Sequence, residues 1–285
     1  MLSEGLWVLA GATLLLIVGV IDDRRGVSPM QKLAAQALAG LCLVAGDVGV
    51  SFLQNPWLNA TVTIVWVVGI CNAMNLLDNM DGLSAGVTAI ASTAFLVLAV
   101  IQGQIWVSLV AAVLLGTTLG FLYFNWNPAT IFMGDAGSLL LGFLLAVMAI
   151  KLRFPVSQSQ HSWLIPIVIL GVPIFDTALV SISRLRRGVP LSAGGKDHTS
   201  HRLVQCGLTV RMAVGVIYVG AAICAGMAVT LRLTPDSPLA FSLSLALLAA
   251  GCVGVIALEK VNLSETGQPT RTERQQMQAE SAAAS

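Results

Sequence analysis

The sequence predicts an all-α, polytopic membrane protein with about nine transmembrane helices. Of its 285 residues, 56% are hydrophobic and 10% are charged, and the mean hydropathy is +0.85. Soluble globular proteins carry about 25% charged residues. A soluble protein with so many hydrophobic residues would need more charged side chains to cover its core, and the class of soluble proteins is therefore excluded. The class that fits the composition is a multi-pass helical membrane protein.

Nine apolar segments follow one another along the chain, and several approach the ~20 residues that a spanning helix needs. The first and the sixth are short, so we expect them to be tilted at their ends or supported by neighbouring helices. The second contains Gly40, Gly46 and Asp47, which leave its outer end open. Residues 1–260 are assigned to one transmembrane domain, and the polar residues 261–285 to a disordered cytoplasmic tail. The nine segments are 6–21, 31–53, 58–76, 84–101, 105–124, 137–152, 163–182, 212–231 and 238–258.

The distribution of Lys and Arg predicts the orientation, because cytoplasmic loops carry an excess of these residues. With the N-terminus outside, three of the fifteen basic residues lie in outer loops, namely Lys151, Arg153 and Arg232. The net charge of +1 gives no reason to expect a nucleic-acid partner. The twelve inner residues are Arg24, Arg25, Lys32, Arg184, Arg186, Arg187, Lys196, Arg202, Arg211, Lys260, Arg271 and Arg274.

Seven aspartates gather at the same inner face, although acidic residues contribute little to topology. A carboxylate inside a bilayer costs about 2.5–3.5 kcal/mol at mid-helix, so such residues are candidates for function. Facing carboxylates repel one another unless a cation lies between them. Mg²⁺ takes one or two carboxylates and completes its shell with water and phosphate oxygens. We therefore expect a site for Mg²⁺, or for Mn²⁺ in its place, and a diphosphate. The seven are Asp22, Asp23, Asp78, Asp81, Asp135, Asp176 and Asp197.

Two of the acidic groups lie at the ends of apolar segments. Asp22 and Asp23 end the first segment, where the alternative is a charged helix end that only sets topology. A second group of amides and acids recurs every three residues, so a helix would place them on one polar face. The alternative for this group is hydrogen bonding between helices. Its members are Asn72, Asn75, Asp78 and Asp81.

The sixth segment is preceded by a short glycine-rich motif. Asp135 stands between Gly134 and Gly137, followed by Ser138. Glycines allow a phosphate to approach the backbone, and a helix N-terminus offers free N–H groups to anions. The alternative is an ordinary helix start capped by Asp135 or Ser138.

The longest basic inner loop contains two histidines, His198 and His201, beside Lys196 and Arg202. Histidines at this spacing can bind zinc, but the neighbouring side chains are hard ligands. Phosphate binding by His, Lys and Arg fits the loop better. A solvated basic loop is the alternative.

These motifs together resemble the polyprenyl-phosphate N-acetylhexosamine-1-phosphate transferases. The family pattern is a DD pair, then NxxNxxDxxDGL, GDxGS, PxFDT and a histidine-containing loop. All five motifs occur here in the family's order, between Asp22 and Leu203. The loop sequence Asp197-His-Thr-Ser-His-Arg-Leu203, and Asn79 within the second motif, resemble the branch that initiates cell-surface polysaccharides with UDP-N-acetylglucosamine.

The resemblance implies a role for each matching residue. Asp135 would bind Mg²⁺, with Asp78 and Asp81 helping to hold the metal and the diphosphate. Asp22 would be the base for the lipid phosphate, with Asp23 beside it. In substrate binding, Lys32 would contact the lipid phosphate, and Asn72 and Asn75 would support the nucleotide site. His198, His201 and Arg202 would bind phosphate or neutralise its charge. Asp176 is assigned a structural or supporting role.

The expected reaction is transfer of N-acetylhexosamine-1-phosphate, GlcNAc-1-phosphate first of all, from a UDP-sugar to polyprenyl phosphate, with release of UMP. The resemblance implies a bacterial plasma-membrane enzyme with a cytoplasmic active site, and a homodimer by analogy. Family members have about two further helices before the DD helix, so we expect the natural start to lie upstream. The alternatives are phospho-N-acetylmuramoyl-pentapeptide transferase, a truncated non-catalytic homologue, and an ion-coupled carrier, although a carrier would hold its ionisable groups near the bilayer midplane.

Overall fold

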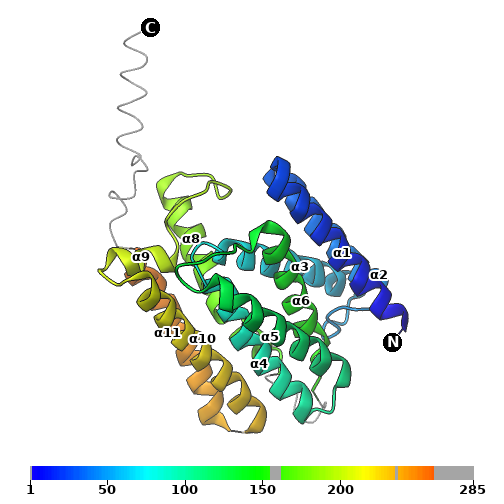
Figure 1. The fold of residues 1–285 in the computed structure, drawn as a ribbon. Helices are drawn as coiled ribbons and strands as arrows, with labels where there is room; N and C mark the ends of the chain where they lie inside the picture. The colour runs from blue at the N-terminus through cyan, green and yellow to red at the C-terminus, as the bar shows by residue number, and fades with distance from the viewer. Residues whose placement is uncertain (1, 155–161, 235–236, 260–285) are drawn as a thin grey trace.

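A computed structural model describes residues 2–154, 162–234 and 237–259 (Figure 1). These residues form helices and connecting turns, which confirms the all-α prediction. The expected tail, 261–285, lies outside the described residues. The helices are α1 (Leu2–Arg25), α2 (Pro29–Ala45), α3 (Pro56–Leu77), α4 (Leu83–Ile101), α5 (Ile105–Asn125), α6 (Gly134–Lys151), α7 (Leu164–Ile169), α8 (Gly171–Arg187), α9 (Thr199–Gln205), α10 (Val210–Leu233) and α11 (Pro238–Glu259).

Seven of the described helices are long and apolar enough to cross a membrane, namely α1, α3, α4, α5, α6, α10 and α11. The chain is therefore a polytopic helical membrane protein, with fewer clear spans than the nine predicted. The predicted segment 31–53 forms a helix only as far as Ala45, because the chain turns at Gly46 and at Asp47, whose φ is 55°. The segment 163–182 is divided between α7 and α8. Pro173 has no N–H for the carbonyl of Ile169, four residues earlier, and α7 ends there.

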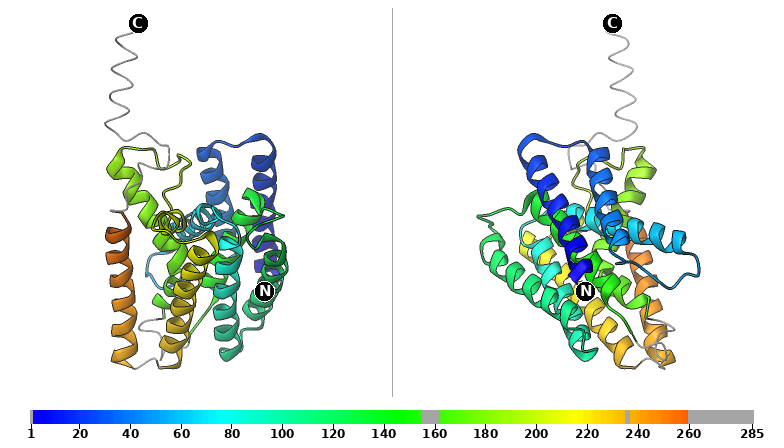
Figure 2. Two further views of the ribbon diagram at one scale, coloured as in Figure 1. Left: turned by 60° about the vertical axis from the view of Figure 1, so that its left-hand side comes forward. Right: turned by 90° about the vertical axis from the view of Figure 1, so that its right-hand side faces the viewer.

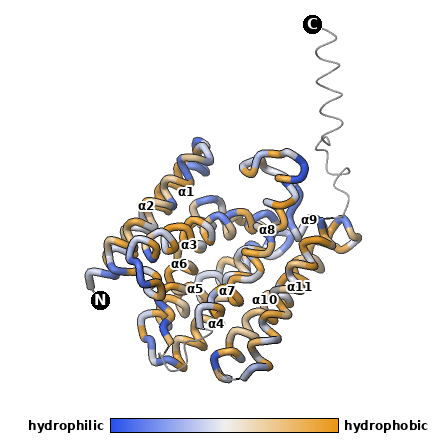
Figure 3. The backbone as a smooth tube through the Cα atoms, turned by 180° about the vertical axis from the view of Figure 1, so that it is seen from behind, coloured by the Kyte–Doolittle hydropathy of each residue, from blue (hydrophilic) through white to orange (hydrophobic). Residues whose placement is uncertain are grey.

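The helices pack around α6 and α4. Helices α1 and α3 pack on α6, α5 packs on α4, and α2 lies against α1 and α3. On the other side of the bundle, α10 contacts α4 and α7, while α8 contacts α3 and α11 (Figures 1 and 2). Figure 3 shows apolar residues along α10 and α11 and hydrophilic residues where α1 and α8 end. Figure 2 places these two helix ends at the same end of the bundle.

Two close helix contacts depend on glycine. A Cβ added to Gly19 of α1 would lie 2.4 Å from the Cα of Ala136 in α6. A Cβ added to Gly142 of α6 would lie 2.6 Å from the Cα of Cys71 in α3. Both obstacles are backbone atoms, which cannot rotate away. Small residues at such positions allow helices in membranes to approach closely. These contacts fix α1 and α3 against α6, the helix that begins at the GDAGS motif.

We predict that Gly142→Ala lowers the stability of the purified protein by about 1–3 kcal/mol, because the added methyl group forces α3 and α6 apart. Thermal unfolding in detergent measures the change. Gly116→Ala in α5 is the matched control, since a Cβ there meets no atom within 4 Å. Equal melting temperatures for the two variants would contradict the prediction.

Candidate functional site

Asp135, at the start of α6, is the point where three helices exchange hydrogen bonds. Its Oδ2 accepts from Nζ of Lys32, on α2, at 2.8 Å. Its Oδ1 accepts from Nδ2 of Asn75, on α3. The same amide nitrogen of Asn75 donates to Oγ of Ser138 at 2.9 Å. The structure thus brings together Asp135, Lys32 and Asn75, which the sequence predicted as site residues.

Lys32 also forms an ion pair with Asp22, near the end of α1. Its Nζ lies 2.5 Å from Oδ2 of Asp22, whose Oδ1 accepts from the N–H of Val27 at 2.6 Å. A short turn explains this proximity. Gly26 adopts a φ of 72° just after α1, and Ser28 with Gln31 forms a capping box that starts α2. Lys32 therefore stands in the first turn of α2, where it neutralises two carboxylates.

Asp23 caps the N-terminus of α6. Its two carboxylate oxygens accept from the N–H groups of Asp135, at 2.7 Å, and of Ala136, at 3.1 Å. Gly134 is required here, because its φ is 66° and a Cβ would lie 2.7 Å from the Asp23 carboxylate. The helix start is thus capped from α1, and not by Asp135 or Ser138, which leaves the Asp135 side chain to its own partners.

Asp78 and Asp81 lie in different surroundings. Helix α3 ends at Leu77 with Asp78 as its C-cap, and Gly82, with a φ of 77°, precedes α4. The prediction that Asp81 shares one helical face with Asn75 is therefore wrong, because the helix stops before it. Asp81 accepts from Nδ2 of Asn127 and from the N–H of Ala129, so it binds the α5–α6 loop.

Asp78 remains next to the Asp135 group. Burial, followed by the negative charges of Asp135 and Asp23, raises the pKa of Asp78 to about 7. Burial is thus the main reason why this carboxyl group resists ionisation, and the two like charges add to it. A divalent cation would reverse that effect, because an opposite charge favours the ionised form.

Asn72 pairs with a residue that the sequence interpretation missed. Its Nδ2 donates to Oε1 of Gln36, on α2, at 2.5 Å and to the carbonyl of Val68 at 2.8 Å. Gln36 is 1% exposed and lies one turn after Lys32. A glutamine four residues after Lys32 in an apolar run is the signal that could have identified it. Asn72 therefore links α2 to α3 one turn away from Asn75.

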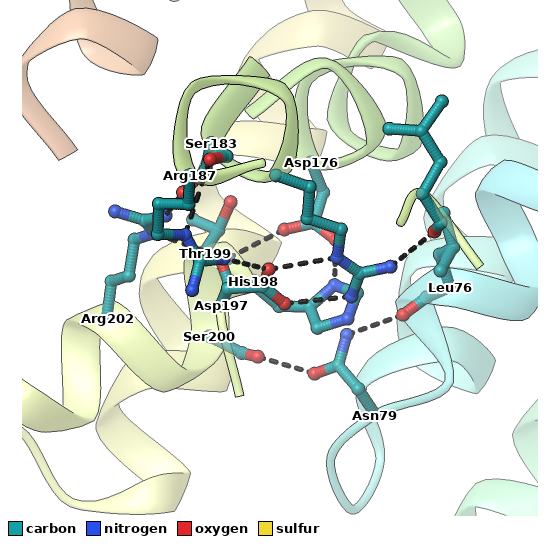
Figure 4. A network of polar contacts seen from close by, with 12 residues as sticks. Leu76, Asn79, Asp176, Ser183, Arg187, Asp197, His198, Thr199, Ser200 and Arg202 are labelled. Atoms are coloured by element: carbon teal, nitrogen blue, oxygen red, sulfur yellow. Dashed lines mark hydrogen bonds and ion pairs between the residues drawn. The ribbon is translucent and has the colours of Figure 1, made fainter. Parts of the chain in front are cut away.

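The histidine loop is held by a buried aspartate of α8. Asp176, 1% exposed, accepts from Nδ1 of His198 at 2.8 Å and from the N–H of Thr199 at 2.7 Å (Figure 4). This carboxylate therefore caps α9 and fixes the His198 ring. His201 is half-buried, and its ring centroid lies 6.3 Å from that of His198. Burial, and then the charges of His198 and Lys196, lower the pKa of His201.

Two arginines of α8 hold the same loop through Asp197. Arg184 forms a bidentate pair with Asp197, with both distances 2.9 Å, and Arg187 adds a contact of 2.6 Å. Burial opposes ionisation of Asp197, but the hydrogen bonds and charge of Arg184, with the charges of His198 and Arg187, hold its pKa below the usual value.

Arg202 is fully buried, at 0% exposure. Its guanidinium donates to the carbonyl of Asp197 and to Oγ of Ser183 (Figure 4), and also to the carbonyl of Leu258. Leu258 lies in the last turn of α11, whose terminal carbonyls lack partners within the helix. The structure therefore places Arg202 where it joins α8, α9 and α11.

A second group of residues, which sequence reasoning missed, holds the α3–α4 turn. The N–H of Gly82 donates to Oδ1 of Asn125, and its carbonyl accepts from the hydroxyl of Tyr218 at 2.5 Å. Arg211 donates to the carbonyl of Asn127 at 2.9 Å. Asn125 is 4% exposed at the end of an otherwise apolar helix, which is a signal for a structural hydrogen bond.

An apolar cavity of about 630 Å³ lies between α7, α8, α10 and α11. Its lining includes Phe175, Val216, Ile223 and Leu247, together with Asp176 and Thr199 of the loop contacts described above. The cavity therefore reaches from apolar helix surfaces to the histidine loop.

The described residues contain no cluster of three or more His, Cys, Asp or Glu side chains arranged to hold a metal. A cage made entirely of protein ligands is thus absent from this part of the chain. Asp135 and Asp78 carry carboxylate oxygens, the type of protein ligand that Mg²⁺ takes together with water and substrate phosphate oxygens.

The sequence model of "Glycosyl transferase family 4" matches residues 6–153. A probable undecaprenyl-phosphate N-acetylglucosaminyl 1-phosphate transferase of Bacillus subtilis is 38% identical over 220 residues, covering 74% of this chain and 61% of that protein. A decaprenyl-phosphate N-acetylglucosaminephosphotransferase of Mycolicibacterium smegmatis is 33% identical over 281 residues, covering 88% and 69%.

A phospho-N-acetylmuramoyl-pentapeptide-transferase of Limosilactobacillus fermentum is 37% identical over 170 residues, covering 55% of this chain and 50% of that protein. The chain thus spans about 61% of the length of the Bacillus relative. The family model covers just over half of the chain, and the Mycolicibacterium relative is similar across nearly all of it. This chain belongs to glycosyl transferase family 4.

Proposed function

We propose that the chain transfers GlcNAc-1-phosphate, or a related N-acetylhexosamine-1-phosphate, from a UDP-sugar to undecaprenyl or another polyprenyl phosphate. UMP is the second product, and the lipid-linked sugar initiates a cell-envelope polysaccharide. The observation that carries this proposal is the convergence of Asp22, Lys32, Asn75 and Asp135 from four helices. The names of the relatives supply the substrate class.

The proposed site is composite, with a polar part and an apolar part. Lys32 and the amide of Asn75, which both donate to Asp135 in this structure, are the proposed hydrogen-bond donors to phosphate oxygens. The cavity between α8, α10 and α11 offers an apolar surface of the kind that a prenyl chain needs. Membrane-facing helices with a charged cluster at one end suit a substrate that stays in the bilayer.

In the proposed reaction, an oxygen of the lipid phosphate attacks the β-phosphorus of the UDP-sugar. A new P–O bond forms to the lipid, the bond between the β-phosphorus and the bridging oxygen breaks, and UMP leaves with that oxygen. Asp22 is the proposed base if the lipid phosphate still carries a proton. A phosphate monoester has a second pKa near 6, so most of the lipid is already dianionic at neutral pH. Lys32 then positions the nucleophile and balances its charge.

Asp135 and Asp78 are the proposed ligands of Mg²⁺, which Mn²⁺ can replace. The metal supplies neutralisation of the diphosphate charge and of the charge that develops on the UMP leaving group. Asp23 holds the backbone of Asp135 in place, and Asp81 holds the α5–α6 loop beside it. We therefore propose that both of these aspartates act by positioning the site.

His201 and Lys196 are the proposed phosphate ligands of the α9 region. His201 is half-buried, and Lys196 is exposed at the end of the loop. His198 is committed to Asp176 through Nδ1, and Arg202 to three protein oxygens. We propose that Arg202 stabilises the loop, in place of the phosphate-binding role that the resemblance implies. Asn72 supports Asn75 through α3 and Gln36.

The proposed topology retains nine crossings. Helix α2, with 17 residues, and the α7–α8 pair supply the two crossings that lack a single long helix. The end of α1 and the end of α8, which carry Arg24, Arg25 and Arg184–Arg187, then face the cytoplasm of a bacterial cell.

The pentapeptide-transferase reaction is the second candidate, because the Limosilactobacillus relative is 37% identical over part of the chain. Asn79 and the loop with two spaced histidines favour the GlcNAc branch. The two candidates differ in the nucleotide sugar that they consume, so one assay with both substrates separates them.

We predict lipid-dependent, EDTA-sensitive UMP release from UDP-GlcNAc and undecaprenyl phosphate. The assay uses the purified 285-residue chain and the same chain extended to any upstream start.

Asp135→Asn should reduce turnover by at least about 1000-fold without unfolding, because it removes a charge from the metal site. Asp47→Asn, at the other end of α2, is the matched control for loss of a carboxylate. Near-normal turnover by Asp135→Asn would refute the metal assignment, and silence with every UDP-sugar would refute the function.

A second prediction separates His201 from Arg202. His201→Ala should raise the KM for the UDP-sugar about tenfold and leave the melting temperature unchanged, since it removes a charge-assisted hydrogen bond to phosphate. Arg202→Ala should lower stability by about 3 kcal/mol or more, because it leaves buried oxygens of Ser183, Asp197 and Leu258 without a donor. Steady-state kinetics and thermal unfolding in detergent measure both effects. A raised KM with unchanged stability in Arg202→Ala, together with lowered stability in His201→Ala, would assign phosphate binding to Arg202 instead of His201.

A further inference from the structure

The two parts of the proposed site are far apart in the chain. The carboxylates lie on α1, α6 and the end of α3, while the histidines belong to the α9 region. A UDP-sugar bound by both parts requires a fixed distance between them. The contact that sets this distance is therefore of functional interest.

Asn79 and Ser200 make such a contact. Oγ of Ser200 donates to Oδ1 of Asn79 at 2.5 Å, across 121 positions of sequence (Figure 4). Ser200 is fully buried, at 0% exposure. Asn79 directly follows Asp78, and Ser200 directly precedes His201. The hydrogen bond thus joins the immediate neighbours of a proposed metal ligand and a proposed phosphate ligand.

Both partners are themselves held in place. Nδ2 of Asn79 donates to the carbonyl of Leu76, in the last turn of α3, at 2.7 Å. On the other side, Thr199 and His198 are bound to Asp176 of α8. A continuous series of hydrogen bonds therefore runs from α8 through α9 to the end of α3 (Figure 4). Because its ends are anchored, this series can transmit position from one part to the other.

We propose that Asn79 and Ser200 form a positioning pair that sets the distance between the metal-binding and histidine parts of the nucleotide-sugar site. The proposal rests on the proposed function for the identity of the ligand. The pair acts through Asp78 and His201 and does not touch the substrate. Its loss weakens binding of the UDP-sugar, which spans both parts, more than binding of the prenyl lipid, whose phosphate lies at Lys32.

The test compares Ser200→Ala, Asn79→Ala and the double variant with wild type, in the presence of Mg²⁺. The Kd for UDP-GlcNAc is measured by calorimetry, which needs no turnover, and the KM for each substrate by UMP release. Each single variant should weaken UDP-GlcNAc binding roughly 5- to 10-fold, as expected for one buried hydrogen bond. The double variant should be no weaker than the singles, because the two side chains act as one unit. The KM for undecaprenyl phosphate should change less than the KM for UDP-GlcNAc.

Ser92→Ala is the matched control. Ser92 is also a fully buried serine, on α4, and its hydroxyl has no hydrogen-bond partner among the described residues. This variant should leave the Kd for UDP-GlcNAc unchanged, whatever its effect on the melting temperature.

Three results would overturn the proposal. They are a Kd in Ser200→Ala equal to that in Ser92→Ala, multiplicative losses in the double variant, and equal increases in the KM for both substrates. A wild type that binds UDP-GlcNAc but releases no UMP contradicts the proposed function and leaves the binding test of the pair intact. A wild type that does not bind the nucleotide sugar contradicts both.

Discussion

The arrangement of the site depends on charge compensation at Asp135. Two carboxylates, Asp22 and Asp135, share the ammonium group of Lys32 at 2.5 and 2.8 Å. Charges near a bilayer are costly unless they are paired. This pairing requires α1, α2 and α6 to meet at one point. Gly19 allows α1 to approach α6 closely, and the hydrogen bonds from the start of α6 to Asp23 hold the two helices together.

The remaining charged groups divide into those that hold the fold and those that stay available. Asp197 is bound by Arg184 and Arg187, and Arg202 is bound to the carbonyls of Asp197 and Leu258. By contrast, Asp78 has a pKa raised to about 7, first because it is buried and then because the negative charges of Asp135 and Asp23 lie near it. A divalent cation beside these carboxylates would favour their ionised forms.

Much of the fold could be predicted from the sequence, because a long apolar run has few alternatives to a helix. The ends of these helices were less predictable. Helix α2 stops at Gly46 and Asp47, and the α7–α8 division depends on the missing N–H of Pro173. Gly46 and Asp47 already left the outer end of the second segment open in the sequence, whereas Pro173 lies within an apolar run and hydrophobicity alone does not reveal the break there.

The candidate site was predictable as a set of residue types, and less so as a geometry. Asp135, Lys32, Asn75 and Asp22 do meet, because their motifs lie at helix ends on one side. Asp81 does not share the helical face of Asn75, since the Gly82 turn intervenes. The burial of Arg202, and the contacts of Gln36 and Tyr218, depend on tertiary packing that a single sequence does not encode locally.

Mn²⁺ binding tests whether Asp135 and Asp78 form the proposed divalent-cation site. Electron paramagnetic resonance of the purified chain with UMP would count bound Mn²⁺ in wild type, Asp135→Asn and Asp47→Asn. We expect one Mn²⁺ per chain in wild type and Asp47→Asn, and at least about tenfold weaker binding in Asp135→Asn. Equal binding in all three proteins, or no binding in wild type, would contradict it.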